Sequence, residues 1–314
     1  MKVIIDSRTG IAREICHLTF RSTDGSDLPP FTPGSHIDLH LPSGLVRQYS
    51  LCGDPRDLRQ YDIAVLREAH SRGGSTEAHT LQPGSVIEIG EPRNLFSLAS
   101  DAKHSILLAG GIGITPLLSM ATHLSTIHAS YELHYCVRDS ARAAFLDRLS
   151  RQPYASHTTI YVDNDERSEN ADFEAILARP DASTHLYACG PDGFITAAMA
   201  TARSQGWQET NIHREFFAVA DPGGSNSYFQ INLARSNRIV DVPADQTALV
   251  ALANAGVEIP SSCEQGVCGT CLTRVLAGEP DHRDMYLSES EQAANDCFLP
   301  CCSRAKSAIL VLDL

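Results

Sequence analysis

The sequence predicts a multidomain chain in which an antiparallel β-barrel, a doubly wound α/β domain and a small α+β domain follow one another. Three observations support this order. Short β-branched segments separated by turn residues fill residues 1–101. Strands alternate with helical periods in residues 102–220. After a linker rich in Gly and Pro at residues 221–227, residues 228–314 combine strands and a helix with a run of cysteines.

The first domain is predicted to be a small barrel because its strands are short and evenly spaced. Turn signals such as Pro42-Ser43-Gly44 and Pro83-Gly84 separate them, and a turn or short helix is expected after Gly74. The expected strands lie near residues 2–7, 11–20, 36–41, 46–52, 61–67 and 85–90.

Two segments of this domain carry residue types that suit a bound phosphate. The first is Arg47-Gln48-Tyr49-Ser50-Leu51, and the second is Ser71-Arg72-Gly73-Gly74-Ser75. Glycines let the backbone approach the phosphate, backbone N–H groups donate to it, and a guanidinium pairs with its charge. Taken alone, each segment is equally compatible with an ordinary strand or loop.

The second domain opens with the continuous apolar run Ser105–Ala109, which is typical of a buried parallel strand. It leads into Gly110-Gly111-Ile112-Gly113-Ile114-Thr115-Pro116 and then into a helical period. Pro116 fits the first helical position and Thr115 fits the N-cap. A strand, a glycine turn and a helix N-terminus together predict a pyrophosphate site, although the pattern is not G-x-G-x-x-G.

The alternation of strands and helices continues to the end of this domain. Further strands are expected at 131–137, 158–162, 184–189 and 211–217, with helices near 141–149, 171–178 and 193–205. Ligands of such sheets bind at the carboxyl ends of the strands, which is where Arg138, Asp139 and Cys189-Gly190-Pro191 fall. Cys189 is also compatible with a small buried hydrophobic residue, and Phe217, at the end of the last strand, with a core phenylalanine.

The cysteines of the third domain form the most specific pattern in the chain. Cys263, Cys268 and Cys271 stand in a C-x4-C-x2-C run, and Cys301 follows farther on. This spacing is that of a plant-type [2Fe–2S] site. Glycines within the run let backbone N–H groups approach the charged cluster. A zinc site usually has two close pairs of ligands, and only one is present here. The adjacent Cys302 leaves a rival for the fourth ligand.

The composition of the chain also bears on its partners and on its location in the cell. The net charge of −13 argues against nucleic acid or an anionic membrane as the main partner. The longest apolar runs are too short to span a bilayer, and the N-terminus lacks the pattern of a signal peptide. With 10 cysteines and no export signal, we expect a protein of the reducing cytoplasm.

The R-x-Y-S and G-G-S segments, in this order, resemble the flavin-binding barrel of the ferredoxin reductase superfamily. The resemblance implies that Tyr49 lies along the isoalloxazine ring and that Ser50 reaches toward its redox-active nitrogen. The phosphate would be held by Arg47 and by a turn comprising Arg72, Gly73, Gly74 and Ser75. Gln48 would be a further flavin-binding residue. The backbone of Ala64, Val65 and Leu66 would edge the ring.

The G-G-x-G-x-T-P and C-G-P segments resemble the pyridine-nucleotide domain of the same superfamily. The residues implied to approach the diphosphate and the nicotinamide are Gly110, Gly111, Gly113, Thr115, Pro116, Cys189, Gly190 and Pro191. Arg138 would lie on the adenosine side, and Asp139 would repel a 2′-phosphate, which favours NADH over NADPH. Phe217 would pack against the flavin, so that Ser50, Thr115 and Phe217 would be the catalytic residues.

The third domain resembles a plant-type ferredoxin of β-grasp fold, and the C-x-S-R-A-K-S alignment favours Cys301 as the fourth ligand. The whole domain order resembles the phthalate dioxygenase reductase and vanillate O-demethylase oxidoreductase family, which implies FMN. Electrons would pass from NADH to FMN, then to the cluster, and from the cluster one at a time to a Rieske-type oxygenase. The reductase would be a monomer. Alternatives are a reductase for a diiron or haem hydroxylase and a redox-sensing iron–sulfur flavoprotein.

Overall fold

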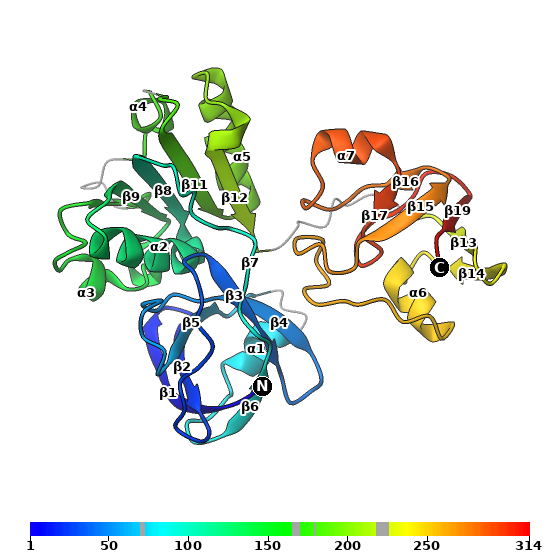
Figure 1. Ribbon diagram of the computed structural model, residues 1–314, viewed down its shortest axis with the longest axis horizontal. Coiled ribbons are helices and arrows are strands. Elements are labelled where there is room, and N and C mark those ends of the chain that lie inside the picture. The colour runs from blue at the N-terminus through cyan, green and yellow to red at the C-terminus, as the bar shows by residue number, and fades with distance from the viewer. Residues whose placement is uncertain (70–72, 165–169, 179, 218–225) are drawn as a thin grey trace. The chain divides into compact units, whose positions relative to one another are not determined.

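The computed structural model describes residues 1–69, 73–164, 170–178, 180–217 and 226–314. It divides into two compact units, Met1–Glu215 and Phe216–Leu314, each of which is described by itself (Figure 1). Arg72, predicted to bind phosphate, and most of the predicted linker at 221–227 lie outside the described residues.

The first unit begins with an antiparallel barrel, as predicted. Its main strands pair in the order β4-β3-β6-β1-β2-β5, and β7 pairs with β3. Leu51, directly after β4, bridges to Ile63 of β5, so the two ends of the sheet meet. The elements are β1 (Lys2–Ala12), β2 (Ile15–Ser22), β3 (Ser35–His40), β4 (Val46–Ser50), β5 (Tyr61–Leu66), α1 (Gly74–Ala78), β6 (Val86–Ile89) and β7 (Arg93–Asn94).

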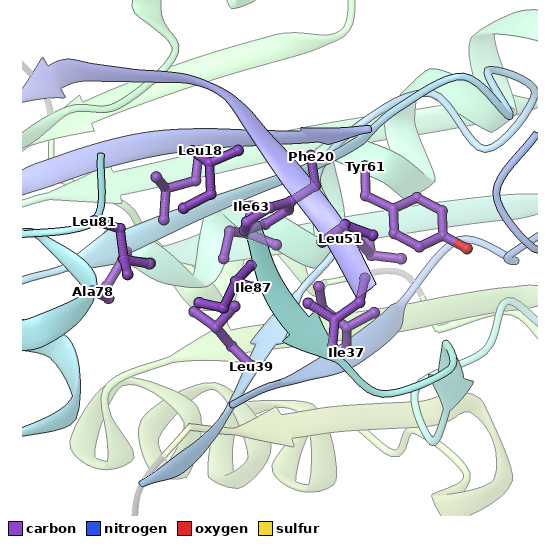
Figure 2. Packing of buried hydrophobic residues seen from close by; sticks show 14 of the residues in the cluster. Leu18, Phe20, Ile37, Leu39, Leu51, Tyr61, Ile63, Ala78, Leu81 and Ile87 are labelled. Carbon is purple, nitrogen blue, oxygen red and sulfur yellow. The ribbon is translucent and has the colours of Figure 1, made fainter. Parts of the chain in front are cut away.

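The core of the barrel follows from the two-residue period of its strands. Alternate side chains such as Leu18 and Phe20 of β2, and Ile37 and Leu39 of β3, are fully buried and point into one cluster (Figure 2). Burying each such side chain contributes about 1.5–3 kcal/mol.

The predicted break between the first two strands was wrong in position. β1 runs on to Ala12, with shifts of register between Ile5 and Ser7 and between Gly10 and Ala12. These bulges absorb the residues that interrupt the sequence period.

A five-stranded sheet follows, in the order β10-β9-β8-β11-β12. β8 pairs in parallel with β9 on one side and with β11 on the other, which makes the carboxyl ends of β8 and β11 the topological switch point. The strands are β8 (His104–Gly110), β9 (Ser130–Val137), β10 (Thr158–Val162), β11 (Thr184–Gly190) and β12 (Ile212–Phe216). The helices are η1 (Gly111–Gly113), α2 (Ile114–Thr126), η2 (Ser140–Arg142), α3 (Leu146–Leu149), α4 (Phe173–Ile176), α5 (Asp192–Ser204) and η3 (Glu209–Asn211).

The predicted start of the helix after the glycine turn was wrong. The 3-10 turn η1 has already reversed the chain, so α2 begins at Ile114 with Gly113 at its N-cap. Thr115 is therefore inside the helix, where its hydroxyl donates to the carbonyl of Ile112 at 3.0 Å. Pro116 is the third helical residue, where the missing N–H costs nothing because first-turn N–H groups have no partner within the helix.

The helix predicted near 141–149 is interrupted in the structure. Phe145 adopts a left-handed conformation (φ 62°), which separates the 3-10 turn η2 from the four-residue helix α3. The left-handed region is disfavoured for a bulky residue, so the surrounding contacts, not local propensity, decide this boundary.

The second unit has the predicted β-grasp arrangement, in the strand order β14-β13-β19-β15-β17 with β13 parallel to β19. Helix α7 was missed, although Ser288 and Glu291 form a capping box that the sequence displays. The elements are β13 (Phe229–Leu233), β14 (Arg238–Val242), α6 (Ala248–Asn254), β15 (Thr273–Ala277), β16 (Pro280–Asp281), α7 (Glu289–Ala294), β17 (Cys297–Phe298), β18 (Arg304–Ala305) and β19 (Ile309–Leu312). Within the described ranges, no helix combines the length and apolar character needed to cross a bilayer.

Candidate functional site

The expected flavin-phosphate residues of the barrel come together in part. A Cβ atom placed on Gly74 would lie 2.6 Å from Cγ of Arg47, so β4 and the start of α1 are neighbours. Gly73 has a φ of 98°, which a residue with a side chain rarely adopts. The Ser75 hydroxyl accepts from the backbone N–H of Glu68 at 3.1 Å, which fixes the turn.

The alternation of β4 separates its residues into two sets. Tyr49 packs against the barrel core, and burial raises its pKa. Gln48, on the other face, donates to Asp38 Oδ1 at 3.1 Å, and Arg93 donates to the same carboxylate. The structure thus places Gln48 in a polar network on β3 and β4 and does not bring it to Arg47.

The strand that was expected to edge the flavin ring is buried over most of its length. In β5, Ala64 and Val65 are buried and Leu66 is half-buried. The carbonyl of Val65 lies 2.8 Å from Nε2 of His79, so one backbone group of this edge already has a partner.

Sequence reasoning missed the partner of Ser50. The Ser50 hydroxyl donates to Glu215 Oε2 at 3.3 Å, which joins β4 of the barrel to β12 of the α/β domain. Burial raises the pKa of Glu215 to about 8. The site therefore holds a carboxyl that is largely protonated near neutral pH. The one sequence signal was a glutamate at the carboxyl end of the last parallel strand.

The glycines of the two strand-end loops pack backbone against backbone. A Cβ atom on Gly113 would lie 2.2 Å from the carbonyl oxygen of Cys189, and one on Gly190 would lie 2.9 Å from Cα of Gly110. Side chains at these positions would separate the ends of β8 and β11. Gly111 is different, because a Cβ atom there meets nothing within 4 Å and only its φ of 55° favours glycine.

The remaining residues of the expected nucleotide site are placed at the same edge of the sheet. Thr115 and Pro116 are buried in the first turn of α2, and Pro191 is the N-cap of α5. Cys189 is fully buried, and burial raises the pKa of its thiol, so it is a neutral group. The aromatic ring of Phe194 lies over Gly110 and Gly190, a neighbour that the sequence did not indicate.

The structure weakens the sequence argument about the 2′-phosphate. Asp139 accepts from Nη1 of Arg13 at 2.8 Å and from the N–H of Ala141 at 2.9 Å. An ion pair with Arg13 offsets much of the negative charge on which the expected repulsion depended. Arg138, directly before it, is exposed. Phe217 follows β12 and is half-buried.

In the second unit, the thiols expected to hold the cluster are buried and lie in two pairs. The Cys263 thiol lies beside that of Cys268 and the Cys271 thiol beside that of Cys301, and these interactions raise the pKa values of Cys263 and Cys271. Among the described residues, no three His, Cys, Asp or Glu side chains surround one metal position. Two thiolates for each of two irons is the donor set that a [2Fe–2S] cluster needs.

The loop also places hydrogen-bond partners beside two of the sulfur atoms. The N–H of Gln265 donates to Cys263 Sγ at 3.3 Å, and Thr270 Oγ1 lies 3.2 Å from Cys268 Sγ. A hydrogen bond with Cys263 is the largest cause that lowers the pKa of Cys268, to about 5. Donors around a thiolate stabilise its charge, so these residues fit the cluster.

Comparisons with known proteins give concordant results. Residues 231–306 match the 2Fe-2S iron-sulfur cluster binding domain, and residues 91–212 match the dimethylamine monooxygenase subunit DmmA-like N-terminal domain. A vanillate O-demethylase oxidoreductase of Pseudomonas sp. is 47% identical over 100% of both chains. A heme-dependent oxidative N-demethylase beta subunit of Ectopseudomonas mendocina is 40% identical over 100% of both.

One solved structure extends the similarity to the fold of the whole chain. Phthalate dioxygenase reductase, which transfers electrons from pyridine nucleotides to [2Fe-2S], has 37% sequence identity and a TM-score of 0.82. The match covers 100% of this chain and 98% of that one.

Proposed function

Because the chain belongs to the vanillate O-demethylase oxidoreductase and phthalate dioxygenase reductase family, we propose that it serves a Rieske-type aromatic-ring oxygenase or O-demethylase. It is an oxidoreductase that uses a flavin, NADH and a [2Fe–2S] cluster. The single observation that carries the proposal is the presence of all three domains over the full length of such a reductase.

When bound, the flavin accepts a two-electron hydride from NADH and the cluster accepts one electron at a time, so the protein converts one kind of transfer into the other. The protein's task is to hold these groups in place and tune them. We infer that the flavin is FMN, with Arg47, Gly73, Gly74 and Ser75 holding its phosphate, and that Ser50 orients its ring. The bond to Glu215 supports this role, because it fixes the Ser50 hydroxyl.

The nucleotide would be held at the ends of β8 and β11. The close packing of Gly110, Gly113 and Gly190 supports this inference, because it brings the backbones at the ends of β8 and β11 together at that edge. Cys189 would contribute shape and a neutral thiol there, since burial keeps the proton on its sulfur. We also propose that Phe217 contacts the flavin. We predict that the protein is a monomer in a reducing cytoplasm.

A haem-containing acceptor is a second candidate. The observation that favours it is the 40% identity with the beta subunit of a heme-dependent oxidative N-demethylase. Both candidates require the same three groups in this chain and differ only in the protein that takes the electrons.

The test is a titration of the purified full-length chain with NADH in the absence of oxygen. Loss of flavin absorbance, followed by loss of iron–sulfur absorbance, is the expected result. Reduction of a Rieske-type oxygenase and of a haem-type oxygenase, each supplied in excess, then separates the two candidates. A chain whose cofactor absorbance does not change with NADH would contradict both.

A further inference from the structure

Arg148 of α3 is hydrogen-bonded both to the barrel and to helix α2 of the α/β domain. Its Nη1 donates to the carbonyl of Cys52 at 3.3 Å, and its Nη2 donates to Thr122 Oγ1 at 2.9 Å. The same Nη2 donates to the hydroxyl of Tyr154 at 3.2 Å, and the guanidinium carbon lies 5.4 Å from the centroid of that ring.

One anchor of Arg148 closely follows the strand that carries Ser50, and the other lies on the helix that carries Thr115. Cys52 stands two residues after Ser50 in the chain. Thr122 lies on α2, about two helical turns after Thr115. Arg148 therefore links the strand that presents Ser50 to the helix that presents Thr115.

The anchors are themselves held firmly. The N–H of Cys52 donates to the carbonyl of Asp62 at 2.9 Å, and the Thr122 hydroxyl donates to the carbonyl of Leu118 at 2.7 Å. Displacing the guanidinium would therefore leave a buried carbonyl and a buried hydroxyl without one partner, while each element kept its own internal bonds. Arg148 therefore connects two parts, the barrel segment at Cys52 and helix α2, each of which is held by its own hydrogen bonds.

We propose that Arg148 is a positioning residue for hydride transfer, which sets the distance between the flavin-carrying strand β4 and the nicotinamide-carrying helix α2. This inference rests on the proposed function. Arginine suits the role because its planar fork reaches two acceptors in different directions at once, whereas a lysine donates from one point. Misplacement of about 1 Å between reacting groups can cost about 100-fold in rate.

The test compares Arg148→Met with Arg151→Met, a matched change at an exposed arginine of the same segment. In the flavin-loaded full chain, the rate of flavin reduction at saturating NADH is measured by stopped flow, with NADH and with its 4-deuterated form. We expect Arg148→Met to slow reduction by about 10- to 100-fold with little change in the affinity for NADH. The deuterium isotope effect should increase, since a longer transfer distance penalises deuterium more.

Two further variants keep the inference testable if Arg148→Met does not fold. Arg148→Lys keeps the charge but reaches only one anchor, and Thr122→Val removes the anchor on the helix. Both should slow reduction in the same direction by a smaller factor. If both match the unaltered protein, the inference is wrong, even if Arg148→Met does not bind flavin.

A second readout does not depend on activity. In the flavin-free protein, Arg148→Met should increase hydrogen exchange in residues 51–53 and in the second half of α2, and Arg151→Met should not. Unchanged exchange, or slower reduction explained entirely by weaker NADH binding with an unaltered isotope effect, would overturn the inference. If NADH fails to reduce the unaltered protein, the proposed function fails, while the exchange data still decide whether Arg148 couples the two elements.

Discussion

Cys301 and Cys302 are neighbours in the sequence, yet their thiols face different surroundings. The Cys301 thiol interacts most strongly with Cys271 and less strongly with Cys302, whereas a Cβ atom on Gly266 would lie 2.4 Å from the Cys302 sulfur. Cys302 therefore packs against the back of the cysteine loop. This contact also gives a second reason for Gly266, whose φ of 73° already favours glycine.

Replacing Cys301 and Cys302 separately tests which one binds iron. We expect Cys301→Ser to lose the iron–sulfur absorbance, because one iron would lack a thiolate, while flavin binding persists. Cys302→Ser should keep the cluster and its spectrum. Equal loss of iron in the two variants, measured by metal analysis, would contradict the assignment.

The Glu215 carboxyl beside Ser50 should make the stability of the protein depend on pH. Burial raises the pKa of Glu215 from 4.5 to about 8. Between these values the folded state binds more protons than the unfolded state, so stability falls as pH rises, by at most about 1.4 kcal/mol per pH unit. Glu215→Gln should remove this decline, which urea denaturation of the flavin-free protein between pH 5 and 8 can measure.

At the level of elements, Arg304 shows why a two-residue strand, β18, holds a fixed position. Its buried guanidinium donates to the carbonyls of Gln246, Ser227 and Pro243 at 2.7, 2.9 and 3.0 Å. It also lies 5.2 Å from the ring centroid of Phe229. One side chain thus bonds to carbonyl groups of two segments, the loop between β14 and α6 and the residues before β13.

Removal of this guanidinium should destabilise the second unit. Arg304→Met leaves several carbonyls without their donor, for an expected loss of about 2–4 kcal/mol. The matched change Arg235→Met breaks an exposed pair with Asp313 and should have little effect on stability. Urea denaturation followed by the iron–sulfur absorbance reports on this unit, and equal losses in the two variants would refute the explanation.

For the whole molecule, the two compact units each have a hydrophobic core of their own. The core of the second unit joins buried side chains of β13, β14, α6 and β19, such as Ile231, Val242, Leu252 and Leu310. Because the core of the first unit needs none of these, each unit should fold without the other.

A chain ending after Phe217 should therefore retain flavin binding and the reduction of ferricyanide by NADH, since ferricyanide accepts electrons from the flavin. The rate of cytochrome c reduction should fall at least tenfold, because the truncated chain lacks the cysteines that would hold the cluster, which passes on single electrons. A truncated chain that neither folds nor binds flavin would show that the second unit is needed to stabilise the first.

Local sequence patterns were sufficient for much of the architecture. The barrel strands, the parallel strands and the cluster site were indicated by residue periods, by turn residues and by the spacing of Cys263, Cys268, Cys271 and Cys301. Apart from the missed helix α7, the errors arose at boundaries. A 3-10 turn displaced the start of α2 from Thr115, and a left-handed Phe145 divided the next helix.

By itself, the sequence determined the order of the domains and the chemistry that each could hold, because those depend on neighbours within a turn or a strand. Only the tertiary structure decided which distant side chains meet. Ser50 and Glu215 are 165 positions apart, Arg13 and Asp139 are 126 apart, and Arg148 and Cys52 are 96 apart. Periodicity reports which face of an element is buried, but not what another element presents to that face.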